Sequence, residues 1–293
     1  MKFKYLIIAF SVIIIVIILV ALVMPMLMAG PDFLINFRQI TLPLLFFMAL
    51  LLCGLSIFFF YNYRLLSLLE REDWPALAYY LEQKIYVKRR YNTRNVRLLA
   101  SSYLVITDYT SVLKLENKAM TVKPSVVEKN ILVFGAARVL SGNRPDAAAF
   151  FKTHLEKSKG KKSKIKESDK QWMRWYYGFI QLLAGTFKTA EPEFKSLASS
   201  SKDAIITGLS SYFLSNTIIK NCENHVECLA AAQSGKERVI KTFKNKEGWQ
   251  KEINKSGGEI HIAVIRKYID EAGAWLFSES QPNPANDKPS LAN

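Results

Sequence analysis

The sequence NILVFGAARVLSGNRPDAAAFF, residues 130–151, decides the fold. Two small residues, Gly135 and Ala147, flank a turn signal that contains Gly142, and the stretch ends on the aromatic Phe151. A glycine at a helix crossing lets two helices approach closely, and a second glycine permits the turn between them. The stretch therefore predicts two helices that fold back on each other, sealed by an alanine and an aromatic ring.

The same pattern returns in YYGFIQLLAGTFKTAEPEF, residues 176–194, at Gly178, Gly185, Ala190 and Phe194. In both copies the offsets between these positions are 7, 5 and 4 residues. This recurrence resembles the tetratricopeptide (TPR) helix–turn–helix repeat, whose small and aromatic positions have this spacing. The resemblance implies an all-α chain in which TPR-like helix–turn–helix repeats stack as an α-solenoid.

The repeat extends towards the N-terminus. The position just after the turn recurs at intervals of 35, 35 and 43 residues, at Trp74, Tyr109, Arg144 and Phe187. TPR units run about 34 residues, and the longer interval contains a lysine-rich insertion. Two residues depart from the pattern, because Arg138 replaces the usual aromatic and His154 replaces a small residue.

Apolar spacing and capping residues predict helices at residues 74–86, 93–106, 108–119, 126–140, 145–157, 170–184 and 188–198. Asp73-Trp74-Pro75 predicts an N-cap followed by a proline in the first turn. A further hairpin is expected at 203–220 and 226–241. The apolar stripe of Gly258–Phe277 predicts a C-terminal capping helix, because a solenoid needs an atypical last element to cover its core.

Two uncharged runs near the N-terminus, Tyr5–Ala29 and Ile40–Tyr61, are each long enough to cross a membrane. A span needs about 20 apolar residues, so the sequence predicts a two-helix transmembrane hairpin. A signal peptide is the alternative for the first run. Its apolar region usually has about 7–15 residues, however, and no small-x-small cleavage site follows here.

Basic residues indicate the orientation of this hairpin. Only Arg38 lies in the connector, whereas four basic residues flank the outer ends: Lys2, Lys4, Arg64 and Arg71. The positive-inside rule then predicts a bacterial inner-membrane protein with both termini and the repeat domain in the cytoplasm. A periplasmic repeat domain is the alternative. The expected domains are the two-span anchor at 1–61, the repeats at 62–200, a C-terminal helical hairpin with capping helix at 201–280, and a disordered tail at 281–293.

The chain carries a net charge of +15, which favours anionic partners. The run Lys157–Lys170 holds seven lysines and is interpreted as a solvated insertion between repeats. The competing interpretation is a basic module that engages anionic lipid or nucleic acid. Nucleic acid is the less favoured ligand, because proteins that bind single strands interleave aromatic residues, and this run has none.

The only cluster of metal-ligand types is Cys222, His225 and Cys228. Free thiols in a helix–turn–helix, a disulfide across the turn and a zinc site all fit this spacing. A structural zinc ion wants four ligands, so no metal and no cofactor is predicted. Neither a nucleophile motif nor a nucleotide-binding motif occurs, and the sequence does not indicate an enzyme.

In TPR proteins the first helix of each unit lines the concave surface, and the resemblance implies a partner-binding groove there. The residues at these positions are Arg94, Arg97, Ser101, Lys129, Leu132, Trp172, Trp175 and Phe179. Such a groove suits a protein or peptide with acidic and apolar side chains, although the aromatic residues could instead pack between repeats. We therefore predict a membrane-anchored scaffold that recruits protein partners. A further alternative is a component of an envelope machine, since TPR proteins of the spirochaete flagellar collar share this layout.

Overall fold

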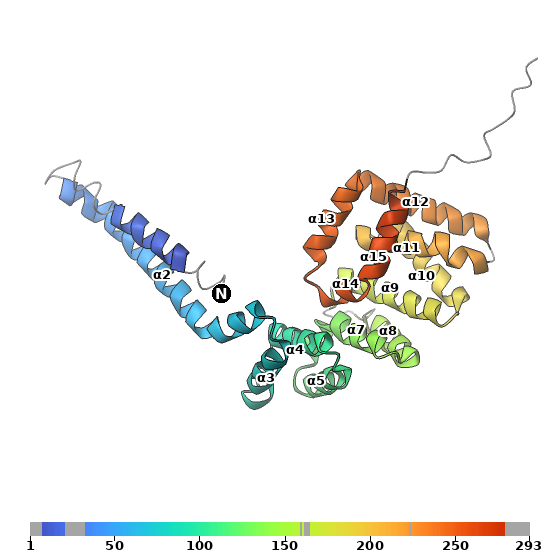
Figure 1. The fold of residues 1–293 in the computed structure, drawn as a ribbon, viewed down its shortest axis with the longest axis horizontal. Coiled ribbons are helices and arrows are strands. Elements are labelled where there is room, and N and C mark those ends of the chain that lie inside the picture. Colours follow the sequence, from blue (N-terminus) through green and yellow to red (C-terminus); the bar gives the residue numbers. More distant parts are fainter. Residues whose placement is uncertain (1–7, 21–32, 159, 161–164, 223, 279–293) are drawn as a thin grey trace, which may run out of the picture. The chain divides into compact units, whose positions relative to one another are not determined.

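The structure is a computed structural model that describes residues 8–20, 33–158, 160, 165–222 and 224–278. Every regular element in these ranges is helical, which confirms the all-α class (Figure 1). The chain forms two compact units, Met1–Arg89 and Arg90–Asn293. The first unit extends beyond the anchor boundary expected at residue 61, because α2 (Phe33–Glu70) and α3 (Trp74–Glu82) pack together.

Among the described residues of the first unit, one helix is long and apolar enough to cross a membrane. This segment of α2, Phe46–Glu70, has a mean hydropathy of 1.8 and buries none of its apolar window within the protein. It overlaps the second expected span. Of the first expected span, the structure describes only residues 8–20, a shorter apolar helix. The rest of Tyr5–Ala29 lies outside the described residues.

The junction between α2 and α3 is a short, capped turn. The Asp73 side chain accepts a hydrogen bond from the amide of Ala76 at 3.1 Å, so the predicted N-cap is confirmed. The Arg64 guanidinium lies 5.4 Å from the centre of the Tyr80 ring. α3 then passes into the π-helical turn η1 (Gln83–Val87).

The second unit is a series of helices in which neighbours along the chain pack against each other: α4 with α5, α7 with α8, α9 with α10, and α11 with α12. Most of the expected helices are present, but the single helix predicted at 126–140 is divided into two by a turn at Lys129 and Asn130. The elements are α4 (Thr93–Val105), α5 (Tyr109–Val122), α6 (Pro124–Glu128), α7 (Ile131–Leu140), α8 (Arg144–Ser158), α9 (Glu167–Leu183), α10 (Phe187–Ser200), α11 (Ala204–Asn216), η2 (Ile218–Asn221), α12 (His225–Phe243), α13 (Lys246–Ser256), α14 (Ile260–Val264) and α15 (Arg266–Leu276).

One turn conformation recurs between helices at the spacing of the sequence repeat. The sequence repeat was numbered by the position just after each turn. The residue two positions before it has a positive φ in every turn: 53° at Glu72, 60° at Thr107, 78° at Gly142 and 75° at Gly185. The next residue caps the following helix in three of these turns, through the side chains of Asp73, Asp108 and Asn143. Glycine is favoured where φ is positive, which explains the two glycines of the sequence pattern.

The close helix approach predicted at the two other glycines is present. A Cβ at Gly135 would lie 2.6 Å from Cε1 of Phe151, inside the van der Waals radius of the ring. At Gly178 the nearest atoms, in Glu193 and Phe194, would lie 3.4 Å away. α7 therefore touches α8 through Gly135, and α9 touches α10 through Gly178, with less clearance in the first hairpin.

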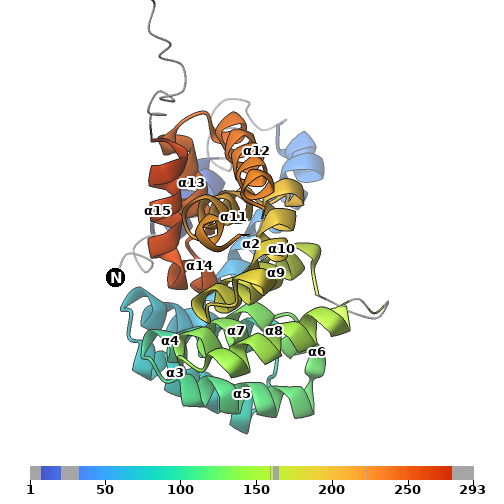
Figure 2. The same ribbon diagram turned by 90° about the vertical axis from the view of Figure 1, so that its right-hand side faces the viewer.

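The C-terminal segment differs from the single capping helix that we expected. Gly258–Phe277 contains two helices, because the backbone breaks at Ile265 between α14 and α15. α15 packs beside α11 and α13 (Figure 2), whereas α14 reaches back to α7. The unexpected helix α13 supplies Trp249, which is fully buried against Gly208 of α11 and Gly273 of α15.

Candidate functional site

A cavity of about 460 Å³ lies in the second unit where several helices begin. Thr93 is the first residue of α4, and Asn130, Lys166 and Glu259 are the N-cap residues of α7, α9 and α14. All four line the cavity. Amides at the starts of α4, α7 and α9 carry partial positive charge towards it. The lining includes four of the predicted partner-binding residues: Arg97, Ser101, Lys129 and Leu132.

Arg97 is held in place between α4 and α7. Its Nε donates to Oδ1 of Asn130 at 3.0 Å, and an Nη donates to the carbonyl of Lys129 at 3.1 Å. The buried Asn130 is fixed in turn, because its Nδ2 donates to the carbonyls of Val126 at 2.9 Å and Thr93 at 3.2 Å. The guanidinium therefore presents its charge at a defined place without an ion-pair partner among the described residues.

His261 of α14 forms the buried side of the cavity. Its side chain is 3% exposed, and its ring lies edge-on to that of Trp172 with the centroids 5.2 Å apart. Nδ1 lies 3.4 Å from Oε2 of Glu259, whereas Nε2 is buried and has no hydrogen-bond partner within the described structure. Burial, aided by the charge of Arg97, lowers the pKa of His261 to about 3, so the imidazole is neutral at physiological pH.

The other charged groups at the cavity are two basic and two acidic side chains. Lys129 and Lys166 are exposed and have no ion-pair partner in the described part of the chain. Asp169, in the first turn of α9, opposes them. Burial raises the pKa of its carboxyl, while Ser168, Lys166 and Arg97 act in the opposite direction. The cationic side chains of Arg97 on α4, Lys129 at the end of α6 and Lys166 at the start of α9 thus share the lining with the carboxylates of Asp169 and Glu259.

The three aromatic residues predicted for the groove do not line this cavity. Trp172, Trp175 and Phe179 are at most 5% exposed. Trp175 and Phe179 stack with their ring centres 5.1 Å apart, and Nε1 of Trp172 donates to Asp203 at 3.1 Å. α9 contacts helices on several sides, so its aromatic face is covered. These side chains pack the core, and their assignment to a partner-facing surface is corrected. Arg94 is exposed but lies outside the cavity lining.

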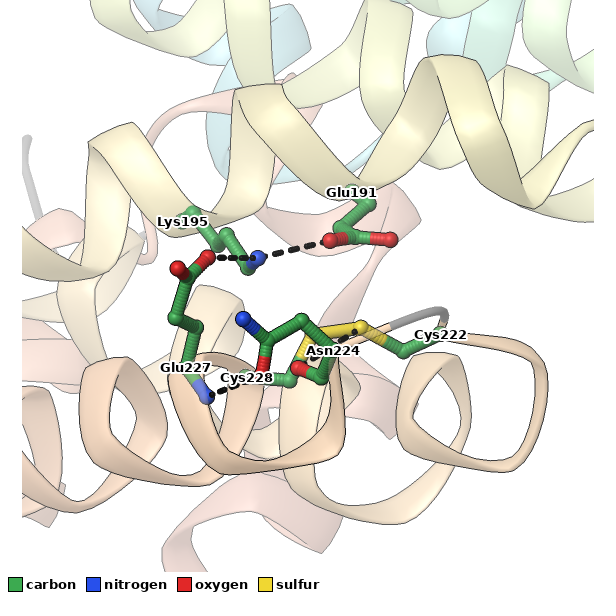
Figure 3. The surroundings of a disulfide bond; sticks show 6 residues. All are labelled: Glu191, Lys195, Cys222, Asn224, Glu227 and Cys228. Atoms are coloured by element: carbon green, nitrogen blue, oxygen red, sulfur yellow. Dashed lines mark hydrogen bonds and ion pairs between the residues drawn. A yellow bond between two sulfur atoms is a disulfide. The ribbon is translucent and has the colours of Figure 1, made fainter.

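Cys222 and Cys228 form a disulfide at the start of α12 (Figure 3). Beside it, Nζ of Lys195 lies 2.7 Å from Glu191 and 3.1 Å from Glu227. The Glu191 carboxylate and both sulfur atoms lie within 4.8 Å of one another, whereas His225 is exposed and outside this group. In the structure the two sulfurs are bonded to each other, so neither is a thiolate that could ligate a metal ion.

A protein-family model described as an uncharacterised Treponema protein matches residues 111–278. The chain belongs to this family. An uncharacterized protein of Treponema pallidum (strain Nichols) is 27% identical over 242 residues, which cover 80% of this chain and 75% of the relative. No solved structure matches the chain. The segment that matches the Treponema family runs from within α5 to the end of α15 and includes Lys129, Lys166 and His261.

The sequence of this Treponema family member did not reveal the buried side of the cavity, which Asn130 and His261 form. His261 lies more than 120 residues from Asn130, and only the return of α14 to α7 joins them. A local signal existed for Asn130, since an asparagine directly before an apolar helix is a common N-cap residue. The lysine run was predicted as an insertion; residues 159 and 161–164 of it lie outside the described structure.

Proposed function

We propose that the chain is a membrane-anchored, TPR-like scaffold that recruits a protein partner and catalyses no reaction. The observation that carries the proposal is the apolar helix Phe46–Glu70. It has 25 residues, and none of its most apolar stretch is buried against the rest of the protein. Lipid is the solvent in which such a surface is stable. The helix ends only three residues before the first capped turn, so the anchor continues into the helical hairpins with a very short linker.

Two observations support the finer architecture. The four positive-φ turns recur at the intervals of the sequence repeat, and Gly135 and Gly178 occupy equivalent positions, next to Phe151 and Phe194 respectively. Both favour TPR-like units stacked as an α-solenoid, whose surfaces bind partners. The second uncharged run, Tyr5–Ala29, supports a two-helix transmembrane hairpin with Phe46–Glu70 as part of its other arm. A partner with acidic side chains suits the exposed Arg94 on α4.

Capture of a partner tests this function. The full-length chain, tagged and isolated from native membranes in detergent without crosslinking, should retain a protein that survives washing at high salt. Arg94→Glu should weaken binding of this protein at least about tenfold and so reduce its recovery, because a like-charge contact at an interface costs more than about 1.4 kcal/mol. Lys255→Glu on α13 is the matched control, since its side chain is 79% exposed and it should change nothing. Recovery that disappears with salt would instead favour the alternative of a basic module that binds lipid or nucleic acid.

Which side of the membrane the repeat domain occupies is a separate question. The distribution of basic residues around the hairpin and the presence of a disulfide favour opposite answers. Four basic residues outside the hairpin against one in the connector favour a cytoplasmic repeat domain. The Cys222–Cys228 disulfide favours an oxidising compartment, and with it a second candidate function. In that candidate the same domain assembles an envelope machine, such as a flagellar collar, outside the cytoplasmic membrane.

Alkylation of intact cells decides between the two sides. We expect Cys222 and Cys228 to be protected from alkylation in the absence of reductant, and to become reactive after reduction. Mass spectrometry of the peptide that contains both residues measures this. Because the cysteines are only six positions apart in the sequence, reduction should lower the free energy of unfolding by only about 2 kcal/mol. Two alkylated cysteines in unreduced cells would restore the cytoplasmic assignment.

A further inference from the structure

The exposed apolar surface of α2 ends at a defined position. Tyr61 and Tyr63 are 77% and 56% exposed, whereas Leu65 is only 3% exposed, where α3 packs against the last turns of α2. Exposed aromatic rings at the end of an apolar span are typical of the boundary between hydrocarbon and lipid headgroups. With Phe46–Glu70 as the membrane anchor, the headgroup layer therefore lies beside Arg64.

Two cationic side chains meet at this level. The Arg64 guanidinium lies 5.4 Å from the centre of the Tyr80 ring in α3, and Nζ of Lys84, one helical turn later, lies 5.8 Å from the same centre. The shared ring holds both charged groups near each other, although they come from different helices. Arg64 is exposed and Lys84 is half-buried, so an oxyanion that approaches from the membrane side contacts both.

The chain that follows Lys84 adds charge of one sign. Residues 83–107 include six lysines and arginines and no aspartate or glutamate. Two of these six, Lys88 and Arg89, follow Lys84 within the first unit and are exposed. Glu82 is the one acidic residue of α3 and η1. We call this set the juxtamembrane basic patch: Arg64, Lys84, Lys88 and Arg89.

We propose that the juxtamembrane basic patch binds the headgroup phosphate of an anionic lipid. The phosphate lies against Arg64 and Lys84, and Lys88 and Arg89 attract further headgroups, as basic residues next to a membrane span do. The acyl chains of the bound lipid lie along the exposed surface of α2. A nucleic acid offers phosphates without such chains, so lipid fits this place better.

This inference rests on the proposed membrane anchor and adds a ligand that partner recruitment does not require. Arg94, which the capture experiment tests, is outside the patch. Extraction of the parent chain from native membranes by alkaline carbonate would contradict the anchor itself. A chain that stays in the membrane but does not discriminate between lipids would contradict the lipid site alone.

Native mass spectrometry of the full-length chain in a neutral detergent counts the lipids that remain bound. Phosphatidylglycerol should bind at least about tenfold more tightly than phosphatidylcholine with the same acyl chains, because each basic residue near an anionic headgroup contributes about a fivefold factor. Glycerol 3-phosphate should not displace it, since it lacks the chains. Equal binding of the two lipids would overturn the proposal. Displacement by glycerol 3-phosphate, or binding of a single-stranded oligonucleotide in place of phosphatidylglycerol, would assign the patch to another ligand.

Variants locate the lipid. Arg64→Gln with Lys84→Gln should lower the affinity for phosphatidylglycerol about tenfold and leave that for phosphatidylcholine unchanged, because glutamine keeps the helix propensity and removes the charge. Lys244→Gln with Lys255→Gln is the matched control, since it removes the same charge from exposed sites in the second unit and should bind as the parent does. An equal loss in the control would show that binding follows the net charge of the chain, and the assignment to the patch would be wrong.

Discussion

Gly135→Ala should destabilise the second unit by about 3 kcal/mol, although it adds a single methyl group. The new Cβ would overlap the Phe151 ring, lying 2.6 Å from its Cε1. That ring cannot move aside, because it is fully buried and stacks on Tyr176 with the ring centres 5.4 Å apart. Tyr176 is fixed in turn by a 2.6 Å hydrogen bond from its hydroxyl to the carbonyl of His261. The strain therefore extends from α7 through α8 and α9 to α14.

Gly178→Ala is the matched control for this substitution. Its Cβ would lie 3.4 Å from Glu193 and Phe194, an ordinary contact, and alanine favours a helix by up to about 1 kcal/mol over glycine. We expect a neutral or slightly stabilising effect there, whereas Gly178→Leu should cost about 2–3 kcal/mol by overpacking. Urea unfolding of the full chain, followed by tryptophan fluorescence, measures all three. If Gly135→Ala unfolds at the same urea concentration as the parent, α7 and α8 are not in close contact there.

These glycines also show how far the sequence determines the fold. Gly135 and Gly142 are seven residues apart, so one local pattern specified both the helix crossing and the turn between α7 and α8. The break between α6 and α7 was not predicted. Thr107 and Glu72 occupy the same turn position as Gly142 without being glycine. Their turns were found from the capping aspartates that follow them, which provide an independent local signal.

The parts that the sequence did not reveal depend on contacts between distant segments. Trp249 makes α13 part of the core by packing against Gly208 and Gly273, and no local spacing connects these three residues. The break at Ile265 was missed for the same reason, since the apolar stripe continues through it. Likewise, apolar spacing alone could not tell that the aromatic face of α9, with Trp175, is covered by other helices. The cavity depends on long-range contacts of the same kind, so only part of its lining was predicted from the sequence.

Arg138 explains how this chain departs from the repeat that it resembles. At the position where the repeat has an aromatic, its guanidinium lies 4.1 Å from the centre of the Phe150 ring, and an Nη lies 2.6 Å from Oε2 of Glu116. A second contact of 3.1 Å joins its Nε to Asp146. The side chains of Arg138 and Glu116 are 13% and 7% exposed, so the charges form a nearly buried pair between α7 and α5. Burial raises the pKa of Glu116 in spite of this partner.

Arg138→Met should therefore be strongly destabilising at neutral pH, by about 3 kcal/mol, because it leaves the Glu116 carboxylate buried without its cation. Without arginine, the pKa of Glu116 rises further above its unfolded value. A carboxyl with a raised folded-state pKa favours folding below its unfolded pKa, and this contribution is lost as pH rises through the folded pKa. The destabilisation should thus be small near pH 4 and grow towards pH 7, as urea titrations at several pH values would show.

The double variant Arg138→Met with Glu116→Leu distinguishes the charge from the packing. It removes both members of the pair and replaces them with apolar side chains of similar length, a change that is often neutral or stabilising in protein interiors. We expect most of the lost stability to return and the pH dependence of the single variant to disappear. A double variant as unstable as Arg138→Met at every pH would show that the arginine acts through its contact with Phe150 and not through the ion pair.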